Sequence, residues 1–147
     1  MPALHVTAQP LPPTRITLDG DMEAIRQGLA QLFQMQPLCD LDDDGRGTAE
    51  IVLAEVLNNI VEHAYADHPG LIRVEVQRRA ADILCRIRDD GHPMPGGTPP
   101  AGTLEPIDAD DPPEGGFGWF LIRAMVRDLT YSREGRENVL AFCLETP

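Results

Sequence analysis

The segment that decides the fold is residues 54–63, AEVLNNIVEH, in which polar and apolar residues recur at helical spacing. Residues four positions apart lie on one face of a helix, so Glu55, Asn59 and His63 are expected to form a polar row. The opposite face carries an apolar stripe, which consists of Leu53, Leu57, Ile60 and Ala64. The polar row has two interpretations. It is either a base, a metal ligand and a phosphate or ribose contact, or the solvated side of an ordinary amphipathic helix.

The composition indicates one globular domain, residues 1–147, that contains no lysine. A chain of this length can bury a substantial hydrophobic core. All 12 basic residues are arginine. The absence of lysine excludes a Walker-type phosphate loop, Schiff-base chemistry and the strand lysine of ordinary protein kinases. Any nucleotide chemistry must therefore use another architecture.

The charge and hydropathy of the chain exclude several classes of partner. A formal net charge of −12 argues against direct nucleic-acid binding, which requires a basic surface. No apolar run approaches the roughly 20 residues that span a bilayer, and the first residues lack the features of a signal peptide. The three cysteines, Cys39, Cys85 and Cys143, are not spaced as metal ligands. We expect a cytoplasmic protein without membrane contact.

Hydrophobic periodicity predicts strands and helices on both sides of the opening segment. The expected strands are residues 15–18, 71–77, 83–88, 129–133 and 139–144, and the expected helices are residues 22–35, 48–66 and about 118–127. The last helix should run through Phe120, Leu121, Ala124 and Met125. Strands 71–77 and 83–88 should pair as an antiparallel hairpin. The acidic residues 42–44 should cap the helix that follows them.

Two stretches show no hydrophobic periodicity. Residues 1–13 are rich in proline and small residues, which is typical of a loose N-terminal arm. Residues 92–114 are dense in proline and glycine, with an acidic second half. A structureless segment of that length inside a compact domain is usually functional or disordered, and this composition fits a mobile lid.

Two short motifs flank the proposed lid. Asp89-Asp90-Gly91 ends a predicted strand, where a carboxylate could accept a hydrogen bond from an amino group such as that of adenine. A plain β-turn explains the same residues. Gly115-Gly116-Phe117-Gly118 opens a predicted helix, where backbone N–H groups can approach an anion. A simple turn is again the alternative.

The order of these motifs along the chain resembles a known superfamily. A helix with Glu-x-x-x-Asn-x-x-x-His precedes a strand that ends in Asp-x-Gly, a long lid and Gly-Gly-x-Gly at a helix start. This order is similar to that of the GHKL superfamily, the Bergerat fold of gyrases, histidine kinases and anti-sigma kinases. Residues 15–145 most resemble the RsbW-type anti-sigma factor serine/threonine kinases. The fold implied is an α/β (α+β) two-layer sandwich, with helices on one face of a mixed, mostly antiparallel sheet.

The resemblance implies a role for each matching residue. Glu55 matches the general base that activates the attacking hydroxyl. Asn59 matches the Mg²⁺ ligand, through its amide oxygen. Asp89 would hold the amino group of adenine, and Gly91 would lie beneath the ring.

The remaining matches concern the phosphates of ATP. The resemblance implies that the backbone of residues 115–118 cradles the phosphates as the lid, residues 92–114, closes; the cluster is Gly115, Gly116, Phe117 and Gly118. His63 stands where the family's helix can reach phosphate or ribose, and a partly buried histidine without a ligand is an equal alternative.

The implied function is that of an ATP-dependent protein serine/threonine kinase that uses Mg²⁺ and acts as an anti-sigma-type partner-switching regulator. It would bind a sigma factor or another target, phosphorylate a STAS-domain antagonist and form a homodimer. The alternatives are a catalytically weak ATP-binding partner module, a simple GHKL ATPase in which water is the acceptor, and an interaction domain that binds no nucleotide.

Two departures from the family pattern matter. Residues 92–114 contain no arginine or lysine, so the lid offers no cation for the γ-phosphate. Phosphoryl transfer depends on electrostatic stabilisation, and a more distant arginine such as Arg123 would have to provide it. Trp119 stands where the family usually has leucine, as either a packing or a partner-contact change.

Overall fold

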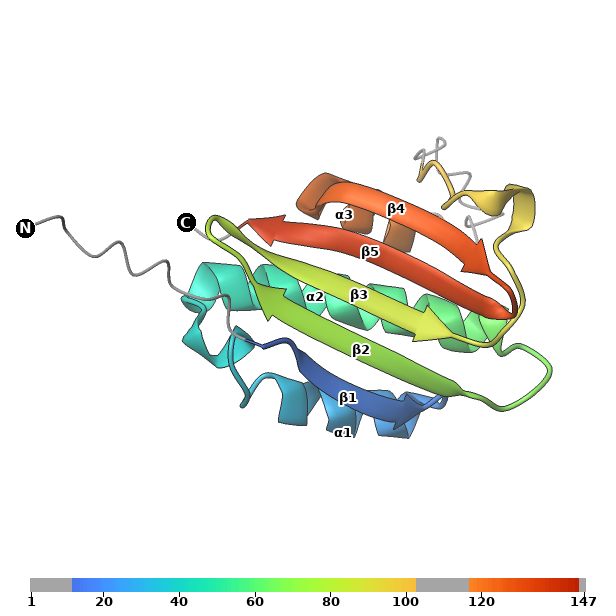
Figure 1. The fold of residues 1–147 in the computed structure, drawn as a ribbon, viewed down its shortest axis with the longest axis horizontal. Helices are drawn as coiled ribbons and strands as arrows, with labels where there is room; N and C mark the ends of the chain where they lie inside the picture. The colour runs from blue at the N-terminus through green and yellow to red at the C-terminus, as the bar shows by residue number, and fades with distance from the viewer. Residues whose placement is uncertain (1–11, 103–116, 146–147) are drawn as a thin grey trace, which may run out of the picture.

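The computed structural model describes residues 12–102 and 117–145. It forms two layers, a five-stranded sheet and a layer of helices behind it (Figure 1). The strands are β1 (Thr14–Asp19), β2 (Leu71–Arg78), β3 (Asp82–Asp89), β4 (Arg127–Glu134) and β5 (Glu137–Glu145). The helices are α1 (Met22–Leu32), α2 (Asp43–Asn59) and α3 (Phe117–Met125), with the short turns η1 (Leu38–Asp40), η2 (Ile60–Ala64) and η3 (Pro95–Gly97).

The sheet has the order β1-β2-β3-β5-β4. All four neighbouring pairs in the described part of the chain are antiparallel, without the parallel pair that a mixed sheet would contain. The two-layer α+β architecture is confirmed, and so is the hairpin of β2 and β3. Strand β5 inserts between β3 and β4, and it thereby places Asn138 directly opposite Asp89.

Helix α2 begins five residues before the predicted start. The side chain of Asp42 accepts a hydrogen bond from the N–H of Gly45 at 2.8 Å, which satisfies one of the free donors at the helix start. Asp43 and Asp44 occupy the first turn, where negative charge interacts favourably with the helix dipole and stabilises the helix. The predicted acidic cap is thus confirmed. The glycines at positions 45 and 47 obscured the true start, because glycine has a low helix propensity.

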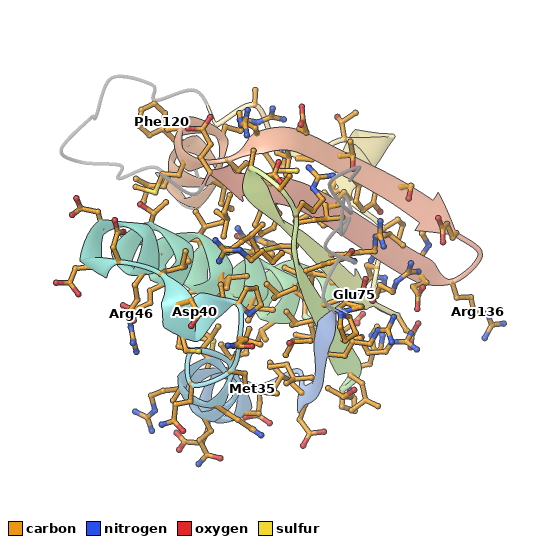
Figure 2. The ribbon with its side chains drawn as sticks, turned by 60° about the vertical axis from the view of Figure 1, so that its left-hand side comes forward. Met35, Asp40, Arg46, Glu75, Phe120 and Arg136 are labelled. Atoms are coloured by element: carbon orange, nitrogen blue, oxygen red, sulfur yellow. The ribbon has the colours of Figure 1, made fainter. Side chains whose placement is uncertain are left out.

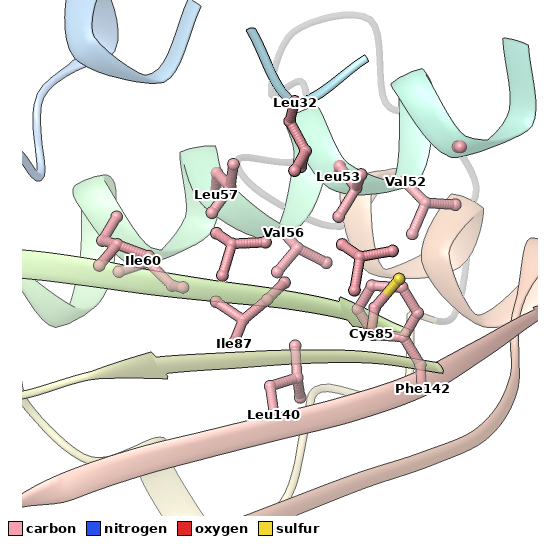
Figure 3. Close-up of a cluster of buried hydrophobic side chains, with 14 of the residues drawn as sticks. Leu32, Val52, Leu53, Val56, Leu57, Ile60, Cys85, Ile87, Leu140 and Phe142 are labelled. Atoms are coloured by element: carbon pink, nitrogen blue, oxygen red, sulfur yellow. The ribbon is translucent and has the colours of Figure 1, made fainter. Parts of the chain in front are cut away.

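The hydrophobic core lies between α2 and the centre of the sheet (Figure 3). The predicted apolar stripe is buried, with exposed fractions of 0% for Leu53 and Leu57 and 7% for Ile60. Burying a side chain of this size contributes about 1.5–3 kcal/mol. These residues face Cys85, Ile87, Leu140 and Phe142 of the sheet. The core therefore fixes which side of α2 is left for the polar row.

Helix α3 is present where the sequence predicts a helix, and one of its faces is buried. Trp119 and Ile122 are 4% and 0% exposed, whereas Phe120 is 41% exposed and stands away from the sheet (Figure 2). Burial of Trp119 shows that its departure from leucine is a packing change.

The opposite face of the sheet is exposed and charged. Arg15 and Arg86 contact Glu75 at 2.8 and 3.5 Å, and Glu75 lies on the side of the sheet away from the helices (Figure 2). Arg88 contacts Glu137 at 2.7 Å. Such exposed pairs contribute at most about 1 kcal/mol each. Within the described ranges, no helix has both the length and the apolar character needed to cross a membrane.

Candidate functional site

A cavity of about 480 Å³ lies among the end of α2, the end of β3, the start of α3 and the segment after β3. Its volume is within the range of small-molecule sites. The lining residues that carry polar side-chain groups are Asn59, His63, Asp89, His92, Trp119, Tyr131 and Asn138. The remaining wall is apolar and includes Ile60, Ala64, Met94 and Leu140. Three residues that the sequence singled out, Asn59, His63 and Asp89, therefore share one cavity.

Asp89 is the buried acceptor of this cavity. It is the last residue of β3 and is only 4% exposed. Its Oδ1 accepts hydrogen bonds from the N–H of Gly91 at 2.9 Å and from Nδ2 of Asn138 at 2.8 Å. Burial raises the pKa of the Asp89 carboxyl, and these two hydrogen bonds oppose that rise in part. Among the described residues, Oδ1 accepts both hydrogen bonds made to the Asp89 side chain. Oδ2 can therefore accept a hydrogen bond from a ligand.

Asn138 positions Asp89, and sequence reasoning did not identify it. Its Nδ2 also donates to the carbonyl of His92 at 2.8 Å, and its Oδ1 accepts from the hydroxyl of Tyr131 at 2.5 Å. Arg133 Nη1 donates to the same Oδ1 at 2.9 Å. The amide thus fixes both the carboxylate and the loop that follows it. The available signal was a polar residue at the start of the apolar run 139–144.

Glu55 and Asn59 meet the start of α3 on the other side of the cavity. A Cβ placed on Gly118 would lie 2.6 Å from Oε2 of Glu55 and 3.6 Å from Nδ2 of Asn59. The missing side chain of Gly118 therefore leaves room for the Glu55 carboxylate against the backbone of α3, and a Cβ would displace it. The structure thus brings together Glu55, Asn59 and one member of the glycine cluster.

The Asn59 amide is short of a partner. Within the described part of the chain, Nδ2 is buried and makes no hydrogen bond. Buried polar groups in native proteins nearly always have a partner, so an orphaned amide indicates a missing ligand. An amide that turns over presents its oxygen instead, and amide oxygens suit Mg²⁺. The residues present therefore fit a magnesium ion and the phosphates it accompanies.

The polar row changes geometry beyond Asn59. Residues 60–64 form a π-helical turn, in which the N–H of Tyr65 donates to the carbonyl of Ile60 at 2.9 Å. Such turns are rare and frequently occur at functional sites. His63 is exposed and lines the cavity, so it is not the partly buried histidine of the alternative interpretation.

Gly91 has a structural role that the sequence did not indicate. A Cβ at Gly91 would lie 2.4 Å from the carbonyl oxygen of Ala64. The adjacent N–H of His92 donates to that same carbonyl at 2.9 Å. The end of β3 therefore packs directly on the end of η2. In this structure the clearance of Gly91 serves that contact, and Gly91 is not in the cavity wall.

The remaining predicted positions are only partly described. Gly115, Gly116 and most of the expected lid, residues 103–114, lie outside the described residues, as does nearly all of the expected arm. Phe117 is the first residue of α3. Arg123 donates to the carbonyls of Pro99 and Pro100 at 2.9 and 2.8 Å. It therefore holds the segment after β3 against α3, and it is not in the cavity wall.

Comparison with known proteins decides the family. Residues 17–144 match the model of the histidine kinase-like ATPase domain. The chain belongs to this family. It is thus an ATP-binding domain of the GHKL type, and the cavity that Asp89 and Asn59 line is its candidate ATP site. No curated protein sequence matches the chain.

Two solved structures are similar to this domain. One is the crystal structure of the RsbU and RsbW domains of Rv1364c from Mycobacterium tuberculosis, at 17% identity and a TM-score of 0.61. The match covers 92% of this chain and 32% of that one, so the domain spans about a third of that protein. The other is the Acinetobacter baumannii histidine kinase AdeS, at 16% identity and a TM-score of 0.48, covering 90% of this chain and 68% of that one. At these identities the likeness concerns the fold.

Proposed function

We propose that this ATP-binding domain is a serine/threonine protein kinase of the partner-switching kind. Its substrate would be a STAS-domain antagonist, and its second partner a sigma factor or another regulatory target. The observation that carries the proposal is the pair formed by Glu55 and the orphaned Asn59 amide against the backbone of Gly118. The fold likeness to a structure that contains an RsbW domain supports the same assignment. A cytoplasmic homodimer is part of this proposal.

The chain's own residues have separate tasks in this proposal. Asp89 Oδ2 accepts from the adenine amino group and orients the nucleotide. The Asn59 amide oxygen would hold Mg²⁺, which would neutralise charge on the phosphates when bound. Glu55 takes the proton of the incoming hydroxyl. Since Glu55 lies one helical turn before Asn59, the base and the metal ligand are held by the same rigid helix.

A catalytically weak ATP-binding module is the second candidate. Residues 92–114 contain no arginine or lysine. Arg123 could have supplied the missing positive charge, but its guanidinium donates hydrogen bonds to the carbonyls of Pro99 and Pro100. Electrostatic stabilisation of the transferring phosphoryl group would then rest on the metal ion and backbone N–H groups. The same features are compatible with slow ATP hydrolysis, in which water is the acceptor.

A phosphotransfer assay with γ-labelled ATP and the cognate STAS-domain protein separates these functions. Glu55→Gln should retain ATP binding and lower transfer by about 10²- to 10⁴-fold, because it removes the base without a change of shape. The control is Glu62→Gln, an exposed residue on η2, which should transfer normally. Transfer that persists in Glu55→Gln contradicts the assigned base. Phosphate release without a partner protein favours the ATPase.

A further inference from the structure

A cluster of three metal-ligating side chains lies beside the cavity and is separate from Glu55 and Asn59. Oδ1 of Asp67 contacts Nδ1 of His68 at 2.8 Å and Nε2 of His92 at 2.7 Å. The ligand atoms of the three residues all lie within 4.8 Å of one another. The two imidazole rings are nearly perpendicular, with centroids 5.2 Å apart. One carboxylate oxygen and two ring nitrogens therefore converge on one point.

Contacts with neighbouring elements hold two of the three residues of this cluster in place. Asp67 and His68 follow η2, and His92 follows β3. The N–H of His92 donates to the carbonyl of Ala64 at 2.9 Å, and its carbonyl accepts from Asn138 at 2.8 Å. The ring of Tyr65 packs edge-on against that of His68, with centroids 5.6 Å apart. Since these contacts already position the His92 backbone and the His68 ring, a ligand would have less conformational freedom to remove on binding.

The fold makes little use of the cluster itself. Asp67, His68 and His92 are all exposed, and exposed ion pairs contribute at most about 1 kcal/mol. None of the three belongs to the hydrophobic core. The hydrogen bonds between them nevertheless bring together groups from positions 25 residues apart. Stability alone gives little reason for this convergence.

The ligand atoms select a class of metal ion. Two imidazole nitrogens and one carboxylate oxygen suit Zn²⁺ and similar transition metals, whereas Mg²⁺ prefers oxygen ligands alone. Ligand atoms about 2.0–2.2 Å from a tetrahedral zinc ion are roughly 3.3 Å apart. The hydrogen-bonded separations of 2.7 and 2.8 Å need to open by about half an ångström, which exposed side chains allow.

We propose that Asp67, His68 and His92 form a binding site for a divalent transition-metal ion such as Zn²⁺. Each neutral imidazole then carries its proton on the other ring nitrogen, so that Nδ1 of His68 and Nε2 of His92 offer lone pairs to the ion in place of their hydrogen bonds to Asp67. Water completes the coordination, as in zinc sites with three protein ligands. His92 also lines the nucleotide cavity. The ion therefore fixes one residue of the cavity wall relative to the end of η2. The site stands whether or not the domain transfers phosphate.

Titration of the nucleotide-free full chain with Zn²⁺ alone tests this proposal, by calorimetry and by competition with a chromophoric chelator. Cys39 is exposed and lies next to Asp40, so the Cys39→Ser variant serves as the background, because it removes a thiolate that could bind Zn²⁺ elsewhere. We expect one ion per chain. Asp67→Asn, His68→Gln and His92→Gln should each weaken binding by at least about tenfold, since even second-sphere changes cost 10- to 100-fold.

The chain has 4 histidines, and the other two provide the matched control. His5→Gln/His63→Gln should bind Zn²⁺ as the background does. Circular dichroism should show that every variant is folded. In NMR spectra of the imidazole groups, Zn²⁺ should shift the signals of His68 and His92 and leave those of His63 in place. Binding that survives the triple substitution of Asp67, His68 and His92, or no binding by the background protein, would overturn the proposal.

Discussion

Replacing Asp89 by asparagine should separate the stability of the domain from its affinity for ATP. The side-chain oxygen of the introduced asparagine can keep both hydrogen bonds that Oδ1 of Asp89 accepts, from Gly91 and from Asn138. Its NH₂ group then takes the place of Oδ2 at the cavity. The acceptor proposed for the adenine amino group becomes a donor, so two donors face each other while the protein's internal contacts persist.

The substitution should weaken ATP binding, whereas it should leave the stability of the nucleotide-free domain unchanged or greater. A hydrogen bond to a charged group contributes about 1.5–3 kcal/mol, so its loss should weaken ATP binding by about 10- to 150-fold. Burial raises the pKa of the Asp89 carboxyl above its ordinary value of 3.8. The folded state therefore binds a proton more readily than the unfolded state, and stability falls as the pH rises from 3.8 through the folded pKa. A neutral asparagine removes this cost, so the nucleotide-free variant should be at least as stable at pH 7.

Calorimetry with Mg·ATP and thermal melts of the nucleotide-free protein measure the two effects. The control is Asp90→Asn, which makes the same charge change one residue away; the side chain of Asp90 is 58% exposed and should affect neither quantity. Guanine carries an oxygen acceptor where adenine carries an amino donor, so Asp89→Asn should also reduce the preference for ATP over GTP. Unchanged ATP affinity in this variant would refute the adenine assignment.

Two further predictions concern the fold. Gly91→Ala should destabilise the domain by about 1–3 kcal/mol in denaturant melts, because the added Cβ would lie 2.4 Å from the Ala64 carbonyl oxygen. Gly47→Ala, a helical position where nothing lies within 4 Å of the new Cβ, should instead stabilise by about 0.5–1 kcal/mol; equal effects at both sites would contradict the packing argument. Hydrogen bonds from Arg79 lower the pKa of Asp82 below 3.8, so this pair's contribution is full above that pH and is lost as the pH falls through the folded pKa. The Asp82→Asn variant lacks this titrating carboxyl, so between pH 5 and pH 2 its stability in thermal melts should fall less than that of the parent protein. Equal losses of stability in the two proteins over this range would refute the linkage.

Much of the fold was predictable because its signals are local. Alternation of apolar residues placed all five strands within a few residues of their observed ends. The 3.6-residue period placed the apolar side of α2, and the polar row followed from it. The sequence also predicted helix α3 but not which of its faces is buried, and packing on the sheet selected the face with Trp119 and Ile122.

The sequence by itself made Asn59, His63 and Asp89 candidates for one site, because a polar helical row, a strand ending in Asp-x-Gly and a glycine cluster follow one another in the order typical of the GHKL superfamily. Only the tertiary structure decided what surrounds them. The partnership of Asp89 with Asn138 joins residues 49 positions apart through the insertion of β5 beside β3. The packing of Gly91 on Ala64 and the convergence of His92 with Asp67 arise where the segment after β3 meets the end of η2. Pairing register and close approach depend on the whole chain, so no local pattern could indicate them.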